Sequence, residues 1–491
     1  MVIFQISTFQ RSIFALFGQR IHAALENGER ICIFGDYDVD GICSTAMLVD
    51  YFHSVGADVG YHIPSRREEG YGMSRGAIDK LHSCGVNLII TVDNGISAAD
   101  EISYCSELGI DVIVTDHHIP PETVPKCTAV VCHTVSNSQY PNSILCGAGI
   151  AFKLLHALAG LEAAMQYVSL AGLASVADVV PLLDENRVFV KLGLDAINSG
   201  NCCNGLYRLL NGVPTARRPY NACTLGFAVA PRLNASGRMS DASLGVELFL
   251  CRDPNRADEI IARLNKLNEL RQQDILNDAI RRLEPCDLSD TRAIVLRSET
   301  WNAGVIGIAA SRIAEMYHRP TILFSESDGI LKGSARSIDG VNIHEVLCCC
   351  REFFVRFGGH AKAAGITMES AFFEDFRLKL NACLKTGYDD SVFIPCKRYE
   401  FDIPLEQVTG ELIAELTRLA PFGESNPSPV FRSRHVAVSR LRRFGSDAQH
   451  TKMDVSPSIS SSATPLDAVW FASAASYYRL LNADTVDMLY T

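Results

Sequence analysis

Long apolar runs are missing from this 491-residue sequence, and its N-terminal residues lack the pattern expected of a secretory leader. No apolar stretch reaches the roughly 18 residues that a membrane-spanning helix requires, so we expect no membrane association. Arg11 interrupts the N-terminal apolar residues, and no small-residue cleavage site follows it, which argues against a signal peptide. A hydrophobic content of 47% and a charged content of 21% fit a soluble globular protein.

Paired cysteine motifs and an excess of basic charge are missing as well. The 17 cysteines include no CxxC pair, so we expect no zinc ribbon and no secreted disulfide framework, and a cytoplasmic, reducing location. The formal net charge of -11 argues against a generic nucleic-acid binder with a broad basic surface. It leaves open a protein that holds phosphates locally, through metal ions and a few arginines.

The sequence does contain a concentration of aspartates after an early apolar run. Residues 31–44 read ICIFGDYDVDGICS, with Asp36, Asp38 and Asp40 at alternate positions. A short β-rich run, a turn and a helix form the start of a βαβ unit, and ligands bind such sheets at the carboxyl ends of the strands. Because crowded carboxylates repel one another, a divalent cation is the expected partner. A calcium loop or a solvated acidic turn is the alternative.

The segment from Ile31 to about Asp184 repeats this order of strand, turn and helix, which predicts a parallel, doubly wound α/β sheet. The predicted strands are Ile31–Phe34, Val59–Ile63, Leu88–Val92 and Val112–Thr115, with helices such as Arg75–Ser83 and Ala99–Leu108 between them. Acids or histidines follow three of these strands and one later helical stretch: Asp36, Asp38 and Asp40; Asp93; Asp116, His117 and His118; and Asp178.

Carboxylates and imidazoles at one sheet edge suit Mn²⁺, Mg²⁺ or Zn²⁺. With five or six such ligands we expect two metal ions a few ångströms apart, a pair that clamps the attacking and leaving oxygens of a phosphoryl displacement. A single histidine would usually be a satisfied surface or core residue. The coincidence of three strand ends indicates a metal-dependent phosphoesterase.

Beyond this region the sequence predicts two further segments. Asn255–Leu283 has uninterrupted helical periodicity, which corresponds to a helix of about 40 Å, and we expect it to bridge two domains. A second α/β segment follows, with predicted strands Ala293–Leu296 and Thr321–Phe324. The residues after 395 are strand-rich and weakly patterned.

The motifs GDYDVDG, DNG, DHH and SVADVVPL occur in that order and resemble the DHH phosphoesterase superfamily. GAGIAFKL at 147–154 and PRLNASGRM at 231–239 narrow the resemblance to the bacterial RecJ family. GSARS at 333–337 and GGHAKAAG at 358–365 resemble the second domain of that family, DHHA1, and APFGESNPSPVF at 420–431 resembles its OB-type third domain. The resemblance covers about residues 30–440.

The resemblance implies two α/β domains, DHH and DHHA1, joined by a long helix and followed by a β-rich OB-like domain. The predicted limits are an N-terminal helical segment at 1–28, the DHH domain at 29–240, the connecting helix at 241–285, DHHA1 at 286–388 and the OB-like domain at 395–491.

A RecJ-like protein is expected to be a 5′→3′ exonuclease for single-stranded DNA that acts in DNA repair and recombination and depends on two Mn²⁺ or Mg²⁺ ions. The matching positions imply the metal ligands Asp36, Asp38, Asp40, Asp93, His117 and Asp178. Asp93 would bridge the ions, and Asp36 would orient the other ligands. His118 would donate to the scissile phosphate or the leaving oxygen, so the catalytic set is His118, Asp93 and Asp178.

Two clusters are expected to bind the DNA strand. The first is Arg232, Asn234, Ser236 and Arg238, because the planar arginine fork suits phosphate. The second is Ser334, Arg336, Ser337, Gly358, Gly359 and His360, where glycine lets backbone N–H groups approach a phosphate. The resemblance also implies that DHHA1 closes over the strand and that the OB domain adds a track on which bases stack.

The sequence departs from the family pattern in its third domain. Ser425 stands where the family motif has glycine, and the likeness weakens after Phe444. Few residues precede the first motif. We therefore expect an incomplete OB barrel, with effects on DNA affinity and end selection rather than on hydrolysis.

Two other functions fit parts of the sequence. One is a DHH-type phosphodiesterase for short oligonucleotides or cyclic dinucleotides, against which the long helix and PRLNASGRM argue. The other is a non-catalytic DHH scaffold, which would be expected to lack some of the ligands. The expected partners of the exonuclease are single-stranded DNA, a helicase and a single-strand-binding protein.

Overall fold

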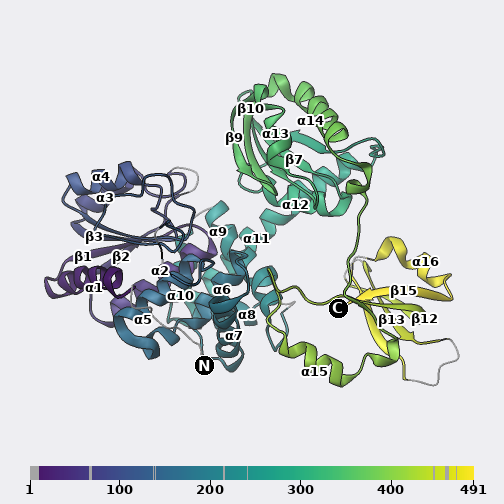
Figure 1. Cartoon of the computed structure of the whole chain (residues 1–491), viewed down its shortest axis with the longest axis horizontal. Helices are drawn as coiled ribbons and strands as arrows, with labels where there is room; N and C mark the ends of the chain where they lie inside the picture. The colour runs from purple at the N-terminus through teal and green to yellow at the C-terminus, as the bar shows by residue number, and fades with distance from the viewer. Residues whose placement is uncertain are drawn as a thin grey trace. The chain divides into compact units, whose positions relative to one another are not determined.

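The computed structural model divides the chain into two compact units, residues 1–395 and 396–491. The residues it describes are 10–65, 69–136, 138, 140–213, 216–239, 242–445, 448–458, 464–471 and 473–491. The predicted N-terminal helical segment contains α1 (Gln10–Glu26), and residues 1–9 lie outside the described ones. Figure 1 colours the chain from its N-terminus to its C-terminus.

The first unit opens with a five-stranded parallel sheet in the order β2-β1-β3-β4-β5. Its strands are β1 (Arg30–Phe34), β2 (Val59–His62), β3 (Val86–Val92), β4 (Asp111–Thr115) and β5 (Ala129–Val131). The sheet confirms the predicted parallel α/β architecture. Sequence reasoning found the first four strands and missed the three-residue β5.

Both faces of this sheet are covered, as parallel strands require. Ile31 and Ile33 of β1 pack into a core shared with α2 (Val39–Ser54) and α5 (Gly147–Met165), whereas Cys32 and Phe34 pack into a second core. That second core is closed by α3 (Arg75–Ser83) and α4 (Ala99–Glu107), which lie on the opposite side of the sheet in Figure 1. The alternation along β1 follows from the two-residue period of a strand.

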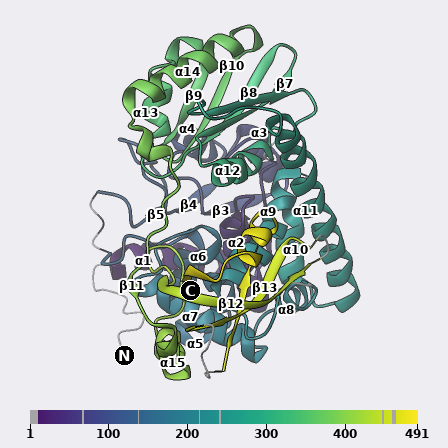
Figure 2. The same cartoon turned by 90° about the vertical axis from the view of Figure 1, so that its right-hand side faces the viewer.

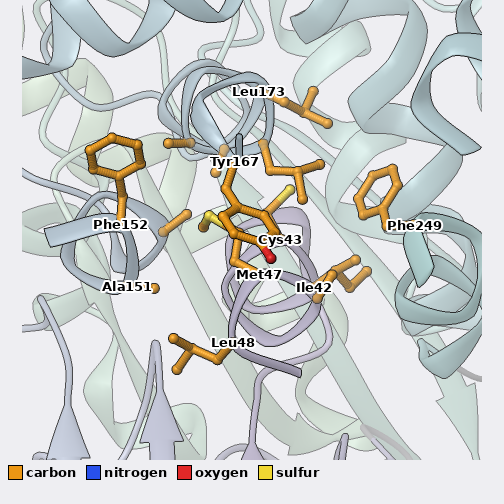
Figure 3. Close-up of a cluster of buried hydrophobic side chains, with 14 of the residues drawn as sticks. Ile42, Cys43, Met47, Leu48, Ala151, Phe152, Tyr167, Leu173 and Phe249 are labelled. Carbon is orange, nitrogen blue, oxygen red and sulfur yellow. The ribbon is translucent and has the colours of Figure 1, made fainter. Parts of the chain in front are cut away.

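Helix α2 is the centre of the larger core. Figure 3 shows Cys43 and Met47 of α2 among Phe152, Tyr167 and Phe249. These rings come from α5, from the residue before α6 (Val168–Ala177) and from α10 (Ser243–Leu250). A helix buried on this many sides cannot rotate, so the residues at its N-terminal end are held firmly in place.

Among the helices that the structure describes, α5 is long and apolar enough to cross a membrane by length and composition. Half of its apolar window is buried, and Gly160, with φ of 83°, divides the helix. Its first half lies in the core beside α2, so α5 acts as a core helix.

The predicted bridging helix is α11 (Pro254–Leu283). Pro254 occupies its first turn, and the side chain of Asp253 caps the helix by accepting from the backbone N–H of Asn255, both of which favour a helix start. Its first half packs against α8 (Asn204–Asn211) and α9 (Ala230–Met239), and its last turns pack against α12 (Ile306–Tyr317). The helix therefore contributes to both α/β cores, as the sequence predicted.

The second sheet has the order β6-β7-β8-β10-β9, with β6 and β7 parallel and the other pairs antiparallel. Its strands are β6 (Ile294–Ser298), β7 (Thr321–Ser327), β8 (Ile330–Arg336), β9 (Phe354–His360) and β10 (Ala363–Glu369). Leu323 faces α12, whereas Ile322 and Phe324 face α13 (Ile343–Cys348) and α14 (Phe373–Gly387). Figure 2 shows α12 and the α13–α14 pair on opposite faces of this sheet.

The second unit is strand-rich, as predicted. Its strands are β11 (Phe401–Asp402), β12 (Phe431–Phe444), β13 (His450–Ser456), β14 (Leu466–Trp470) and β15 (Thr485–Tyr490), with α15 (Gly410–Arg418) and α16 (Tyr477–Leu481) between them. The sheet order is β11-β12-β13-β14, and β15 pairs with β12. The predicted domain limits stay a prediction.

Candidate metal centre

The acids and histidines of the first domain meet because their strands are neighbours in the sheet. Strand β3 lies between β1 and β4, with Phe34 level with Thr91 and Val92 level with Thr115. The segments that follow these strands therefore start from the same edge. Asp178 reaches this edge from a different direction, as the residue that ends α6.

The first motif forms the start of α2. The Oδ1 atom of Asp38 caps this helix by accepting from the backbone N–H groups of Asp40 (2.9 Å) and Gly41 (3.1 Å). Asp40 is 1% exposed, and its two carboxylate oxygens accept from the N–H groups of Gly147 (2.6 Å) and Ala148 (2.7 Å) at the start of α5. The positive end of a helix dipole thus faces a buried carboxylate, which stabilises it.

Gly147 is required at this contact. A Cβ atom added there would lie 2.8 Å from Cβ of Asp93 and 3.1 Å from Oδ2 of Asp40. Any side chain would fill the space between the two carboxylates, so the glycine keeps open the volume in which a cation would sit.

Asp93 lies at the centre of the group. It is 1% exposed and has a left-handed backbone with φ of 62°, a conformation that non-glycine residues seldom adopt away from functional sites. Its Oδ1 lies 3.0 Å from Nε2 of His117, yet this buried oxygen receives no hydrogen bond. Nε2 of His117 also lies 3.7 Å from a carboxylate oxygen of Asp40 and from one of Asp178.

The buried carboxylates lack enough positive charge around them. Burial, followed by repulsion from Asp40 and Asp38, raises the pKa of Asp93 well above its usual value. Burial also raises the pKa of Asp40, and burial together with the charges of Asp40 and Asp38 raises the pKa of Asp178 to about 8. A divalent cation would remove this penalty, because it favours the ionised form of every acid around it.

Three groups of side chains within the described residues have ligand atoms that all lie within 4.8 Å of one another. They are Asp36, Asp38 and Asp93; Asp40, His117 and Asp178; and Asp93, His117 and His118. Asp93 belongs to two of the groups. Carboxylate oxygens with one or two imidazoles form a donor set that fits Mn²⁺ or Mg²⁺.

Asp116 orients His118, a role that sequence reasoning missed. Its Oδ1 lies 2.7 Å from Nδ1 of His118 and accepts from the backbone N–H groups of His117 and His118, while Oδ2 accepts from the N–H of Ile96. The contact with Asp116, against the effect of burial, raises the pKa of His118. Asp116 is the acid of the DHH motif itself. The motif therefore pointed to this residue, but roles are predicted from the sequence only for its two histidines.

Two further residues near the metal centre belong to none of the sequence motifs described above. Tyr71, on the loop after β2, places its hydroxyl 3.3 Å from Nδ1 of His118. His133 follows β5, the strand that was not predicted, and burial followed by the charge of His117 lowers its pKa to about 4.

The first expected substrate cluster lies on α9, and its members differ in their surroundings. Oδ1 of Asn234 accepts from the backbone N–H of Val39 (3.1 Å), which joins α9 to the start of α2. Nε of Arg232 donates to Oδ1 of Asn265 (2.7 Å). Ser236 is fully buried and donates to the carbonyl of Leu233, and the side chain of Arg238 lies outside the described residues.

The second expected cluster lies on neighbouring strands of the second sheet. Arg336 of β8 and His360 of β9 flank the same residue of β10, Ala363. Nη1 of Arg336 donates to Oγ of Ser334 (2.9 Å), and the hydroxyl of Ser337 donates to the carbonyl of Val341. Gly358 and Gly359 lie on β9, whose one described neighbour in the sheet is β10.

Three family models match the chain. Residues 30–177 match the DHH family, N-terminal domain, residues 290–386 match the DHHA1 domain, and residues 399–491 match the RecJ OB domain. The match to the RecJ OB domain continues past Phe444, although the recognisable motifs of the family weaken there.

The curated relatives with the highest identity share one name. The chain is 39% identical over 457 residues to the single-stranded-DNA-specific exonuclease RecJ of Bacillus subtilis, covering 92% of this chain and 57% of that protein. It is 34% identical over 463 residues to the protein of that name from Escherichia coli, covering 89% of this chain and 80% of that one. The chain thus spans little more than half of the first relative and four-fifths of the second.

Solved structures agree with this relationship. The crystal structure of RecJ from Thermus thermophilus in complex with Mn²⁺ matches with a TM-score of 0.75 and 32% identity, covering 94% of this chain and 68% of that one. A structure of the same protein in complex with Mg²⁺ matches with a TM-score of 0.70 and 31% identity, covering 93% of this chain and 66% of that one.

Proposed function

The chain belongs to the RecJ family of single-stranded-DNA-specific exonucleases, and on that premise we propose that it removes nucleotides from the 5′ end of single-stranded DNA by metal-dependent hydrolysis. The observation that carries the proposal is the buried carboxylate of Asp93, whose Oδ1 lies beside Nε2 of His117 and receives no hydrogen bond. A phosphodiester hydrolase needs such a site, and a scaffold protein does not.

The cofactors are two Mn²⁺ or Mg²⁺ ions. Asp36, Asp38 and Asp93 would hold one, and Asp40, His117 and Asp178 would hold the other, with Asp93 shared between them. When bound, two such ions lower the pKa of a water molecule and neutralise charge on the attacking and leaving oxygens. Asp36 is buried with the ligands and also keeps its expected role of orienting them.

His118 is the proposed donor to the scissile phosphate or the leaving oxygen. Its Nδ1 is engaged by Asp116 at 2.7 Å, whereas Nε2 has a long contact of 3.5 Å with the Tyr71 hydroxyl, so Nε2 is the nitrogen proposed to reach the substrate. Asp116 also favours the protonated imidazole, the form that can donate to an oxygen carrying negative charge.

The DNA backbone is held by arginines and by a helix N-terminus. Arg232 and Asn234 on α9, with Arg238 of the same motif, would hold phosphates near the first motif, whereas Ser236 is buried and donates to the carbonyl of Leu233. Around Ser334 and Arg336, the start of α12 supplies backbone N–H groups without a side-chain cap. A Cβ added to Gly307 of that helix would lie 2.8 Å from both Oγ of Ser334 and Nη2 of Arg336, so both side chains lie close to the start of the helix, where they and its N–H groups could bind one phosphate.

Ser337, Gly358, Gly359 and His360 complete the same surface. Gly358 to His360 are exposed on β9, where backbone N–H groups and an imidazole could contact successive phosphates. DHHA1 would in this way close over the strand that the DHH domain cuts.

The second unit would bind bases rather than phosphates. Phe444, His450 and Phe471 form a ring cluster with centroids 5.1, 5.3 and 6.3 Å apart, and Phe471 is 67% exposed. Arg443 lies 4.4 Å from the ring centre of Tyr477. Exposed rings with arginines are the surface on which single-strand-binding domains stack bases.

The proposed setting is DNA repair and recombination in the cytoplasm. All 17 cysteines are free thiols, which suits a reducing compartment. An enzyme limited to single strands needs a helicase to open duplex DNA, and a single-strand-binding protein would meet it on the same strand.

The test uses three DNAs with Mn²⁺: a long single strand, a duplex with a 5′ single-stranded tail, and a blunt duplex, each labelled at either end. We expect processing of the single strand and of the tail from the 5′ end, stalling at the duplex. Because few side chains neutralise phosphates, the log–log slope of binding against salt should be about -3 to -4. Equal digestion of the blunt duplex, or cleavage confined to dinucleotides, would contradict the proposal.

A further inference from the structure

Tyr71 touches the metal centre from a loop that none of the recognised motifs includes. The loop follows β2, and Tyr71 stands between two glycines in the left-handed region, Gly70 with φ of 87° and Gly72 with φ of 78°. Its hydroxyl lies 3.3 Å from the backbone carbonyl oxygen of Asp93. It also lies 3.3 Å from Nδ1 and 3.5 Å from Nε2 of His118.

These contacts give the hydroxyl a defined direction. The carbonyl of Asp93 can only accept, so the phenol proton points to that carbonyl and the oxygen lone pairs point to the His118 ring. The hydroxyl oxygen of Tyr71 is nearly equidistant from the two ring nitrogens of His118. It therefore lies beside the edge of the imidazole between these nitrogens. Asp116 holds Nδ1 from another side at 2.7 Å.

The two contacts restrict different motions of the imidazole. A single bond to Nδ1 fixes one atom of the ring but lets the ring tilt about that atom. The Tyr71 ring meets the His118 ring edge-on, with centroids 5.8 Å apart and planes at 73°, and blocks this tilt. Tyr71 is itself braced by Tyr37 of the first motif, with centroids 6.4 Å apart at 78°.

We propose that Tyr71 is a positioning residue that holds the His118 imidazole in its working orientation and links it to the backbone of Asp93. The inference rests on the proposed function, since it assigns a helper to the donor of that reaction. Tyr71 would act on the rate of turnover through His118 and not on the affinity for DNA, because its hydroxyl is engaged within the protein.

The exposed part of Tyr71 suggests one competing role. The residue is 51% exposed, so its ring could instead stack on a base of the substrate. Stacking would appear in KM and would survive replacement by phenylalanine, whereas positioning through the hydroxyl would not. The two roles therefore separate in a single variant.

The experiment measures kcat and KM on a 5′-phosphorylated single strand with Mn²⁺ for the wild type, Tyr71→Phe, His118→Ala and the double variant. Tyr104→Phe is the matched control, because that tyrosine donates a comparable hydrogen bond, to Asp79 on the surface of the same domain. We expect Tyr71→Phe to lower kcat about three- to tenfold, the usual effect of one hydrogen bond, with KM unchanged. In the His118→Ala background the same change should have no effect on kcat.

Each other outcome overturns the inference. Unchanged kcat in Tyr71→Phe would leave the hydroxyl without a role, and a rise in KM alone would make Tyr71 a substrate contact. An equal loss of kcat with and without His118 would show that Tyr71 acts through Asp93 instead. An inactive wild type would contradict the proposed function itself, so the two failures are distinguishable.

Discussion

The metal centre of the DHH domain and the surface of the unit 396–491 are built in opposite ways. At the metal centre the key side chains are buried: Asp40 and Asp93 are 1% exposed, and the Asp40 carboxylate accepts from two backbone N–H groups at the start of α5. On the second unit the candidate DNA-binding ring Phe471 is exposed, and the hydrophobic cluster found among the described residues is small, with the buried members Leu405, Val436, Met453, Val455 and Leu480.

The difference matches two physical tasks. Hydrolysis depends on ligands held within a fraction of an ångström, and only a large core such as the one around α2 supplies that rigidity. Stacking on an arbitrary sequence of bases depends on accessible rings that tolerate different partners. We therefore expect changes in the first region to alter rate and metal-dependent stability, and changes in the second to alter affinity.

The largest effect is expected from Asp93→Ala. Loss of the shared carboxylate should lower the hydrolysis rate by orders of magnitude, because both proposed metal positions lose a ligand. Circular dichroism and a melting curve without metal should show an intact fold, since a carboxylate that is repelled by its neighbours has been removed. Retention of more than about a tenth of the wild-type rate would contradict the bridging role.

The pH dependence of stability should be next in size. Since the pKa of Asp178 is raised to about 8 in the folded protein, protonation favours the folded state. The metal-free protein should therefore lose stability as the pH rises from about 4 to about 8. At pH 8, adding Mn²⁺ should raise the melting temperature by about 5 °C or more.

The control for this pH effect is Asp178→Asn, which removes the group that titrates. This variant should flatten the pH dependence and weaken the response to Mn²⁺. A metal-free wild type whose melting temperature rises over the same pH range would contradict the conclusion that the buried carboxylates lack enough positive charge around them.

A smaller effect is expected from Phe471→Ala in the second unit. Removal of one stacking ring should weaken binding of a fluorescent single strand about fivefold, the lower range for such contacts, measured by anisotropy without divalent metal. The kcat on saturating DNA should not change. Leu481→Ala is the matched control, since Leu481 is also exposed in this unit, at 55%. Equal weakening by both variants would show that the effect is not stacking.

The smallest effect is expected from Ser425→Gly. Ser425 has φ of 59°, a left-handed conformation that costs a non-glycine residue about 1 kcal/mol, and the family motif has glycine at this position. The substitution should stabilise the protein by less than about 1 kcal/mol, because part of the gain is offset by the greater freedom of glycine in the unfolded chain. Ser425→Ala should give no such gain in a urea unfolding curve.

The sequence predicted the parts of this molecule that depend on local pattern. Apolar runs such as Leu88–Val92 predicted the strands of the first sheet, and the acids after them predicted the candidate ligands. The repeated order of strand, turn and helix predicts parallel strands, whose carboxyl ends lie at one edge of the sheet. The helix predicted at Asn255–Leu283 from its periodicity begins one residue earlier in the structure, at Pro254.

What the sequence could not predict depends on tertiary contacts. Tyr71 lies 47 positions before His118, and no spacing rule connects them. Ser236 was expected to face a phosphate, yet in the structure it is buried on α9. Packing of α9 against α2 and α11 decides which side of α9 faces the core. The motif PRLNASGRM alone does not reveal that side.

The central claim is that the carboxyl end of the first sheet holds two divalent cations around Asp93. Its most direct test is anomalous diffraction at the manganese edge, from crystals of the whole chain grown with Mn²⁺. We predict two anomalous peaks, with the carboxylate of Asp93 touching both and His117 touching one. The absence of peaks within reach of Asp93, with manganese bound elsewhere on the chain, would contradict the account.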